Sequence, residues 1–165
     1  MNSSETVLTH PFPPVYDRES RLLILGSFPS VKSREEGFYY GNPRNRFWKI
    51  LEIIFNTGLC TIEEKKAFLL SRHIALWDCI ASCRIHASSD SSITDAVPND
   101  IASLLKESRI ERIITNGNKA YEVYMKYICP MVKTEVIRLP STSPANAAWS
   151  LEKLTQAWKE YIVIS

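Results

Sequence analysis

Residues 21–48 have the sequence RLLILGSFPSVKSREEGFYYGNPRNRFW, which joins a short apolar run, a long segment of loop-forming residues and the beginning of a helical pattern. The apolar run, residues 21–25, ends at Gly26 and predicts a buried strand. Residues 27–43 contain two prolines and two glycines and predict a loop, and so long a loop in a compact domain usually has a function. Residues 45–55 then place apolar side chains at helical spacing.

The same alternation of strand and helix continues along the chain. Further strands are predicted at residues 74–77, 109–115 and 134–139, and helices at residues 61–71, 99–106, 119–127 and 147–161. Thr61 is the expected N-cap of the helix at 61–71, with Glu64 completing a capping box. Residues 83–98 are polar and predict a loop, and residues 1–20 predict an extended N-terminal arm.

This alternation predicts an α/β fold with three layers, αβα, around a central, mostly parallel four-stranded sheet. The 165 residues fit a single domain, residues 1–165. In sheets of this kind the functional site lies outside the carboxyl ends of the strands. The segments expected there are residues 26–45, Asp78 and the residues after it, Asn116-Gly117, and residues 140–146.

The composition is that of an ordinary globular protein, with 45% hydrophobic and 23% charged residues. No apolar run approaches the ~18–20 residues that cross a bilayer, and residues 1–20 lack a signal-peptide pattern. We therefore expect a cytoplasmic monomer with no membrane partner. The net charge of +2 is compatible with nucleic-acid binding but does not argue for it, because a local basic patch would be needed.

The four cysteines, Cys60, Cys79, Cys83 and Cys129, form no CxxC pair. One interpretation is a set of iron–sulfur ligands, and the simpler one is thiols that pack as small apolar side chains. Their spacing matches no ligand pattern, which favours the second interpretation. No His/Cys/Asp cluster has zinc spacing either, so neither a metal nor another cofactor is predicted.

Two loops carry residues that are unusual for packing alone. The first contains the pair Tyr39-Tyr40 and ends at Asn45, which lies between Arg44 and Arg46 at a predicted helix start. Aromatic side chains with arginines suit a base and its phosphates, and helix N-termini attract anions. The alternative is that the tyrosines cover the core and Asn45 is an ordinary helix cap.

The second loop, within LPSTSPANA at residues 139–147, is rich in hydroxyl groups between a strand and a helix. Its hydroxyls and backbone amides could hold a phosphate. Its alternative is a helix-capping turn, with Ser143 as the cap and Pro144 at the first helical position. A capped helix start is itself an anion site, so the two interpretations are compatible.

Taken together, these motifs resemble the uracil-DNA glycosylase superfamily. The combination of Gly-Ser-Phe-Pro at 26–29, Tyr-Tyr-Gly-Asn-Pro-Arg-Asn-Arg-Phe-Trp at 39–48 and Leu-Pro-Ser-Thr-Ser-Pro-Ala-Asn at 139–146 is most similar to its hypoxanthine-DNA glycosylase branch. Ala-Leu-Trp-Asp at 75–78, Asn99-Asp100 and Asn116-Gly117 agree with it. The resemblance extends from about residue 21 to 161, and it implies a uracil-DNA glycosylase-like fold and a DNA substrate containing a deaminated base.

The resemblance also implies roles for individual residues. It makes Asn45 the catalytic residue, which would orient a water molecule through its side-chain carbonyl. Base contacts are expected from Gly26, Ser27, Phe28, Tyr40 and Asp78. Contacts with the DNA backbone are expected from Arg44, Ser141, Thr142, Ser143 and Asn146. Because the scissile bond is buried in a duplex, the target nucleotide would be flipped into the site.

Departures from related sequences narrow the expected chemistry. Phe28 stands where the mismatch-specific enzymes have a catalytic Asn, and Leu139 where the uracil-specific family has a catalytic His. Ser30 stands where the hypoxanthine branch usually has Gly, and Asn42 where it usually has His. Phe28 favours Asn45 as the working residue, and Leu139 argues against an efficient uracil enzyme. Ser30 and Asn42 are departures from the pattern of the hypoxanthine branch itself.

Asp78 follows the second strand, where an ionised carboxylate would only accept hydrogen bonds. Hypoxanthine offers an N1–H donor, whereas adenine has an acceptor at that atom, so Asp78 could separate the two bases. The alternative is an Asp that caps the next helix.

Other functions remain open: a uracil or mismatched-thymine glycosylase, a non-catalytic nucleic-acid-binding module of the same fold, or a small-molecule α/β enzyme. No complete GxGxxG or P-loop supports the last. No lysine in the motif loops suits a lyase, so a monofunctional enzyme is expected. The three histidines, His10, His73 and His86, fall outside the motifs and are interpreted as structural or surface residues.

Overall fold

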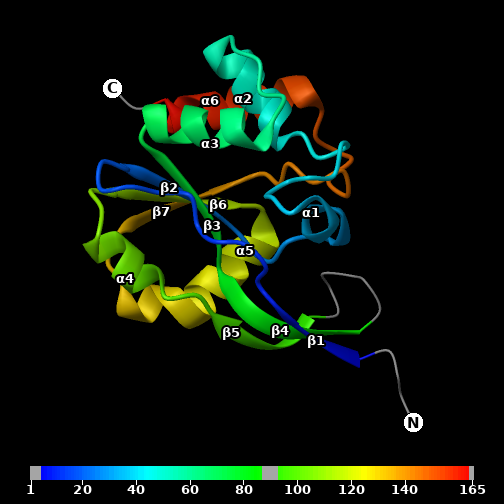
Figure 1. The fold of residues 1–165 in the computed structure, drawn as a ribbon, viewed down its shortest axis with the longest axis vertical. Coiled ribbons are helices and arrows are strands. Elements are labelled where there is room, and N and C mark those ends of the chain that lie inside the picture. Colours follow the sequence, from blue (N-terminus) through cyan, green and yellow to red (C-terminus); the bar gives the residue numbers. More distant parts are fainter. Residues whose placement is uncertain (1–4, 87–92, 164–165) are drawn as a thin grey trace.

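A computed structural model describes residues 5–86 and 93–163. Its centre is a parallel sheet with the strand order β3-β2-β6-β7 (Figure 1). These strands are β2 (Leu22–Gly26), β3 (Ile74–Asp78), β6 (Arg112–Asn116) and β7 (Glu135–Leu139). All four strands that the sequence predicts are confirmed, with ends shifted by a few residues, and so is the α/β fold with its parallel sheet.

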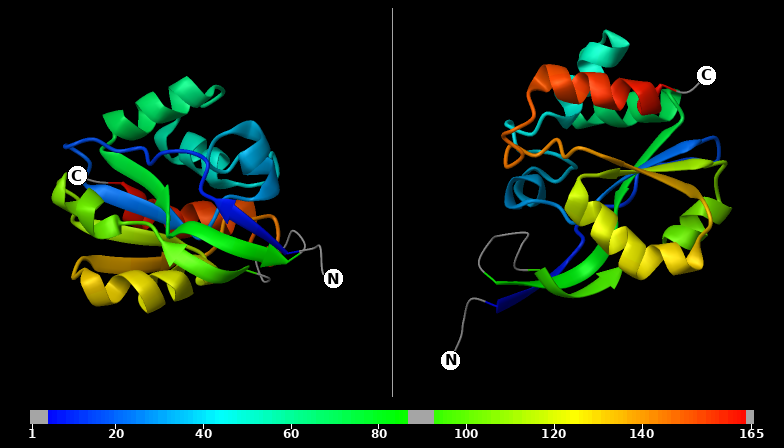
Figure 2. Two further views of the ribbon diagram at one scale, coloured as in Figure 1. Left: turned by 60° about the horizontal axis from the view of Figure 1, so that its bottom comes forward. Right: turned by 180° about the vertical axis from the view of Figure 1, so that it is seen from behind.

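Helices cover both faces of this sheet because successive residues of β2 point to opposite sides. Leu22 and Ile24 pack into a core with α2 (Phe47–Phe55), α3 (Ile62–Ser71) and α6 (Leu151–Ile162). Leu23 and Leu25 pack into a second core with α4 (Ile101–Lys106) and α5 (Asn118–Val123). The two helical layers lie on either side of the sheet in Figures 1 and 2.

Helix boundaries follow local capping groups. The Thr61 hydroxyl accepts the Glu64 N–H at 3.1 Å, which confirms Thr61 as an N-cap. The last helix begins at Leu151, later than the predicted residue 147, because the Ser150 side chain caps it. Helix α5 continues as a π-helical turn, η2 (Tyr124–Ile128), and a 3₁₀ turn, η3 (Cys129–Met131).

A second sheet was not predicted. It is antiparallel, with the order β1-β4-β5, and consists of β1 (Glu5–Thr9), β4 (Ile80–His86) and β5 (Ile93–Pro98). The prediction of a loop over residues 83–98 was therefore wrong at both ends, and residues 87–92 lie outside the described part. Within the arm predicted at residues 1–20, the described residues include β1, a strand that pairs with β4 and that was not predicted.

The first motif loop also contains a helix that was not predicted, α1 (Val31–Glu36). Ser30 begins it: its side chain accepts the Ser33 N–H, and its backbone is extended, with φ −65°. Ser30 therefore replaces the usual glycine without backbone strain. Gly37 ends the helix in the left-handed region, with φ 80°.

Among the described residues, no helix is long and apolar enough to span a bilayer. All four cysteines are free thiols: Cys79 and Cys83 are buried, Cys129 is half-buried and Cys60 is exposed. The two buried thiols pack in the core between the sheet and α4 and α5, as small apolar side chains do.

Candidate active site at the carboxyl ends of the parallel strands

A pocket of about 110 Å³ opens at the carboxyl ends of β2, β3 and β6. It is lined by both motif loops and by the ends of these strands. Of the predicted site residues, it gathers Gly26, Ser27, Phe28, Tyr40, Asn45, Asp78, Ser141, Thr142 and Ser143. Arg44 and Asn146 lie outside it. The pocket also contains residues that lie in the segments expected at this edge of the sheet but were not named as contact residues: Pro29, Ser30, Ser33, Tyr39 and Asn116.

The floor of the pocket requires a glycine at position 26. A Cβ on Gly26 would lie 2.4 Å from Oδ1 of Asp78 and 3.0 Å from the Tyr40 hydroxyl oxygen. The first distance is too short for a real contact and the second is tight, so a glycine lets β2 approach these two side chains. The Asp78 residue is 3% exposed, at the end of the neighbouring strand β3.

Tyr40 forms one wall. Its ring packs against Phe47 with centroids 4.4 Å apart, and its backbone lies in the left-handed region with φ 54°, which is unusual for a bulky residue. Its hydroxyl is buried and has no hydrogen-bond partner among the described residues. Burial, and then the charge of Asp78, raise the pKa of this hydroxyl well above its usual value, so it stays protonated. The Asn116 side chain opposes this rise in pKa, but its amide is engaged elsewhere.

The first motif loop offers free backbone donors to the pocket. Among the described residues, the N–H groups of Ser27 and Phe28 donate to no acceptor, whereas the carbonyls of Gly26 and Ser27 accept from Cys79 and Ile80. The loop is thus anchored through its carbonyls and leaves its amides available. Unpaired amides beside a pocket suit an oxygen that carries negative charge.

Asn45 is held by a chain of hydrogen bonds that starts at Asn116. Nδ2 of Asn116 donates to the Thr142 hydroxyl at 3.0 Å, and that hydroxyl donates to Oδ1 of Asn45 at 2.8 Å. Oδ1 also accepts the Phe47 N–H at 2.9 Å, and the Thr142 N–H donates to Oδ1 of Asn116 at 3.0 Å. Both lone pairs of the Asn45 carbonyl are therefore used, and its Nδ2 has no partner among the described residues.

The second motif loop keeps hydroxyl donors near the pocket. The Ser141 hydroxyl accepts the Ser143 N–H, and the Ser143 hydroxyl accepts the Ala145 N–H, each at 3.1 Å. Since both hydroxyls act as acceptors inside the loop, their hydrogens stay available for an outside acceptor. Asn146 donates to the Ser141 carbonyl at 3.0 Å, so it shapes this loop from within.

Thr142 differs from its neighbours because it is fully buried. Its hydroxyl and N–H are engaged as described above, and its carbonyl accepts the Arg46 N–H at 3.0 Å. Its contribution to the site is to hold Asn45 and the loop in place. The sequence pattern alone groups it with Ser141 and Ser143.

The two arginines beside Asn45 have opposite surroundings. The Arg46 guanidinium donates to the backbone carbonyls of Ser143 at 2.8 Å, Asn146 at 3.1 Å and Trp149. It therefore ties the two motif loops together. The Arg44 side chain is exposed and has no partner among the described residues, so it is available to a phosphate.

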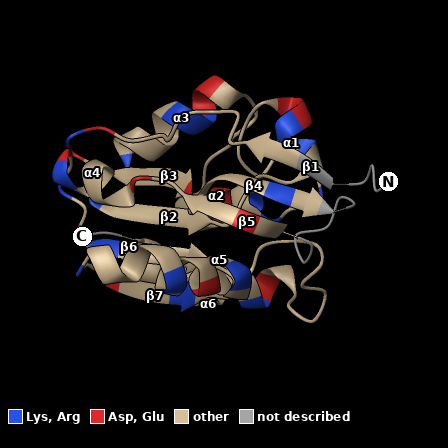
Figure 3. Ribbon diagram, turned by 90° about the horizontal axis from the view of Figure 1, so that it is seen from below, with Lys and Arg blue, Asp and Glu red and all other residues tan. Residues whose placement is uncertain are grey.

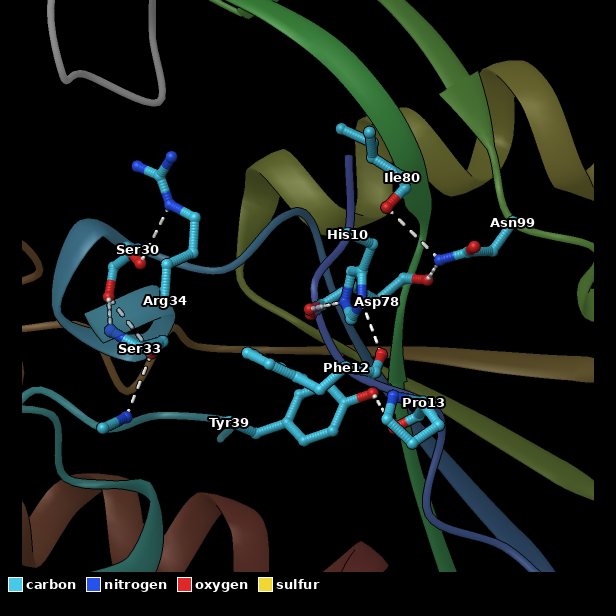
Figure 4. Close-up of polar contacts among 11 residues, drawn as sticks. His10, Phe12, Pro13, Ser30, Ser33, Arg34, Tyr39, Asp78, Ile80 and Asn99 are labelled. Atoms are coloured by element: carbon cyan, nitrogen blue, oxygen red, sulfur yellow. Dashed lines mark hydrogen bonds and ion pairs between the residues drawn. The ribbon is translucent and has the colours of Figure 1, made fainter. Parts of the chain in front are cut away.

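His10 is a site residue that the sequence analysis missed. Its Nε2 lies 2.8 Å from Oδ2 of Asp78, and its Nδ1 lies 2.8 Å from the carbonyl oxygen of Phe12 (Figure 4). Asn99 supports the same strand end by donating to the backbone carbonyl of Asp78 at 2.8 Å. No sequence signal connects His10 to Asp78, because the contact joins residues that are distant in the chain.

Positive charge near the site comes from a few side chains rather than from an extended basic surface. Lysines and arginines are interspersed with acidic residues over several elements (Figure 3). A wider groove adjoins the pocket and shares Ser27, Asn116, Ser141 and Ser143 with it, and Lys119 and Arg138 also line this groove. Within residues 5–86 and 93–163, no group of three or more His, Cys, Asp or Glu side chains could hold a metal ion.

Comparison with known proteins decides the family. The model of the uracil DNA glycosylase superfamily matches residues 13–162. The chain belongs to the uracil DNA glycosylase superfamily. Within this superfamily, it is 38% identical over 144 residues to a protein named hypoxanthine DNA glycosylase from Methanosarcina acetivorans, covering 84% of this chain and 89% of the relative.

A second relative of the same name, from Methanosarcina barkeri, is 33% identical over 153 residues, covering 90% of this chain and 94% of the relative. A solution NMR structure described as that of a candidate uracil DNA glycosylase from Methanosarcina acetivorans superposes with a TM-score of 0.81 at 32% identity. That match covers 95% of this chain and 97% of the other. The superfamily fold therefore extends over nearly the whole chain.

Gly26→Ala tests the packed floor of the superfamily pocket. The added methyl group overlaps Oδ1 of Asp78, so we expect the free energy of unfolding to fall by about 1–3 kcal/mol. Urea unfolding measures it. Gly58→Ala is the control, because nothing lies within 4 Å of its Cβ position and its change should stay below about 1 kcal/mol. Equal stability of the two variants would contradict the close approach.

Arg46→Met tests the clamp between the loops. The variant keeps the aliphatic stem but leaves three carbonyls without their charged donor, so we expect a loss of roughly 1.5–3 kcal/mol in the free energy of unfolding. Arg44→Met is the matched control and should change stability by less than about 0.5 kcal/mol. Urea unfolding of both variants decides, and a similar loss in the two would refute the assignment of the clamp to Arg46.

Proposed function

We propose that this protein is a monofunctional DNA glycosylase that hydrolyses the N-glycosidic bond of a deaminated base, with hypoxanthine as the preferred base, in base excision repair. The observation that carries the proposal is the single pocket that brings together Asn45, Tyr40, Asp78 and the free amides of the first motif loop. Membership of the superfamily and two relatives named hypoxanthine DNA glycosylase support it.

Hydrolysis of this bond develops positive charge on the sugar and negative charge on the departing base. The free N–H groups of Ser27 and Phe28 are placed to stabilise an oxygen of that base. Because these donors are fixed by the anchored loop, they need no reorganisation as the charge develops. This arrangement supplies leaving-group stabilisation without a histidine at position 139, where Leu139 is buried and lies outside the pocket.

The base would enter the pocket by rotation out of the duplex. Tyr40 offers its ring for stacking on the flipped base, and Phe47 supports that ring from within the protein. The strained backbone at Tyr40 is typical of a functional position, where the surrounding structure maintains the strain.

Asn45 holds the attacking water. The sequence analysis expected the side-chain carbonyl to orient it, but that carbonyl already accepts two hydrogen bonds. We therefore assign the contact to Nδ2, which donates to one lone pair of the water and leaves the other lone pair to attack the sugar. Anchoring at Oδ1 fixes the amide, and fixed geometry is the main contribution that such a group makes.

Asp78 recognises the base through a carboxylate oxygen, which accepts a hydrogen bond from a ring N–H of the base. Deamination of adenine converts the N1 acceptor into an N1–H donor, which a carboxylate oxygen accepts and adenine cannot supply. Uracil and xanthine also present a ring N–H, so Asp78 separates deaminated bases from adenine rather than from one another. No lysine lines the pocket, which supports hydrolysis without lyase chemistry.

Base release tests the proposal. End-labelled duplexes with one deoxyinosine, one uracil or one xanthine are incubated with the protein without added metal, and abasic sites are then cleaved with alkali. We expect release from deoxyinosine, a loss of about a hundredfold or more in Asn45→Ala, and a loss of about tenfold in Thr142→Val, which removes one anchor of Asn45.

Thr155→Val is the matched control, because its hydroxyl bonds the Leu151 carbonyl within α6, away from the pocket. Release from uracil alone would assign the enzyme to another branch of the superfamily. Binding to DNA without release of any base would favour the non-catalytic module.

Arg44 tests the proposed contact with DNA. Its exposed guanidinium is expected to neutralise one phosphate, so Arg44→Met should weaken binding to duplexes of any sequence. It should also reduce the slope of log K against log salt by about 1. Fluorescence anisotropy over a salt series measures both, and an unchanged slope would assign phosphate binding to other residues.

A further inference from the structure

The His10–Asp78 pair is buried behind the pocket. Both side chains are 5% exposed, and His10 lies on the segment between β1 and β2, with its N–H donating to the Ala81 carbonyl at 2.7 Å. Its ring packs among the rings of Phe12, Phe28 and Tyr39, with centroids 5.0, 6.0 and 5.8 Å away. The ring is therefore fixed in orientation by packing as well as by its two hydrogen bonds (Figure 4).

The two contacts of the ring fix where hydrogens lie. The Phe12 carbonyl can only accept, so Nδ1 of His10 must carry a hydrogen. The 2.8 Å contact between Nε2 and Oδ2 of Asp78 then contains one proton, which belongs either to an imidazolium or to the carboxyl group. In both cases the proton lies between Nε2 of His10 and Oδ2 of Asp78, and Oδ1 of Asp78 carries no proton.

That other oxygen is the one that meets the base. Oδ1 of Asp78 lies beside Gly26 in the pocket and has no hydrogen-bond partner among the described residues. Without His10, nothing favours Oδ2 over Oδ1 as the site of a proton on this carboxyl group. A protonated Oδ1 would donate to the N1 acceptor of adenine, and the distinction between adenine and its deaminated form would be lost.

We propose that His10 is a specificity-determining positioning residue, which keeps the pocket-facing oxygen of Asp78 a pure acceptor and so excludes undamaged adenine. The proposal rests on the proposed function. It concerns how that site selects its base, and it does not place His10 in contact with the DNA or with the reacting atoms.

The experiment is a double-mutant cycle on duplexes with one deoxyinosine among several adenines, so that alkali cleavage reports release of both bases on one labelled strand. His10→Phe keeps an aromatic ring but removes both hydrogen bonds. We expect release from deoxyinosine to fall by about tenfold to a hundredfold, and cleavage at adenines to rise relative to it.

In the Asp78→Asn background, His10→Phe should change release from deoxyinosine by less than about twofold, since the side chain through which His10 acts has been altered. A merely structural role would lower release equally in both backgrounds. His73→Asn is the control, because His73 is exposed at φ 61°, a conformation that asparagine tolerates.

Unchanged release and unchanged discrimination in His10→Phe, or the same fall in both backgrounds, would overturn the inference. Circular dichroism establishes that each variant is folded. If His10→Phe is not, His10→Leu replaces it in the cycle, since leucine also removes both hydrogen bonds of the ring. Failure of the wild-type protein to release any base would instead refute the proposed function, independently of His10.

Discussion

The hydrogen bonds from Arg46 to three backbone carbonyls of the second motif loop hold the candidate active site together. The two motif loops come from distant parts of the chain and follow β2 and β7, which are not neighbours in the parallel sheet. Arg46 lies directly after Asn45, so the same clamp brings Thr142 within hydrogen-bond distance of the Asn45 carbonyl. The position of the proposed catalytic amide therefore depends on a guanidinium that lies outside the pocket.

The pocket is built from features that are unfavourable in isolation. Tyr40 has a left-handed backbone, which costs about 1–3 kcal/mol, and its hydroxyl is buried without a partner. Asp78 is buried, and it needs His10 as an ion-pair or hydrogen-bond partner. The surrounding packing maintains these unfavourable features. Gly26 packs closely against Asp78 and Tyr40, and aromatic rings surround His10.

Some of this arrangement could be predicted, and the reason for each success or failure is physical. Strands β2 and β3 of the parallel sheet are buried on both faces, so each appears as a continuous apolar run that can be recognised without its partner strand. Strands β1, β4 and β5 are at least as long as those of the parallel sheet, but each contains polar residues among its apolar ones. Their stability comes from pairing between residues such as Val7 and Arg84, which no local pattern reveals.

The sequence by itself predicted the four strands of the parallel sheet, every α-helix except α1, the place of the candidate site at the carboxyl ends, and most residues of the pocket. These follow from local periodicity, from motifs of fixed spacing and from the family resemblance that the motifs carry. Only the tertiary structure decided which of the two arginines that flank Asn45 is a clamp and which is exposed, and that Thr142 anchors Asn45. It also showed that His10 pairs with Asp78. Each of these depends on a hydrogen bond between residues that are distant in the chain, and a sequence records the donors and acceptors but not their pairing.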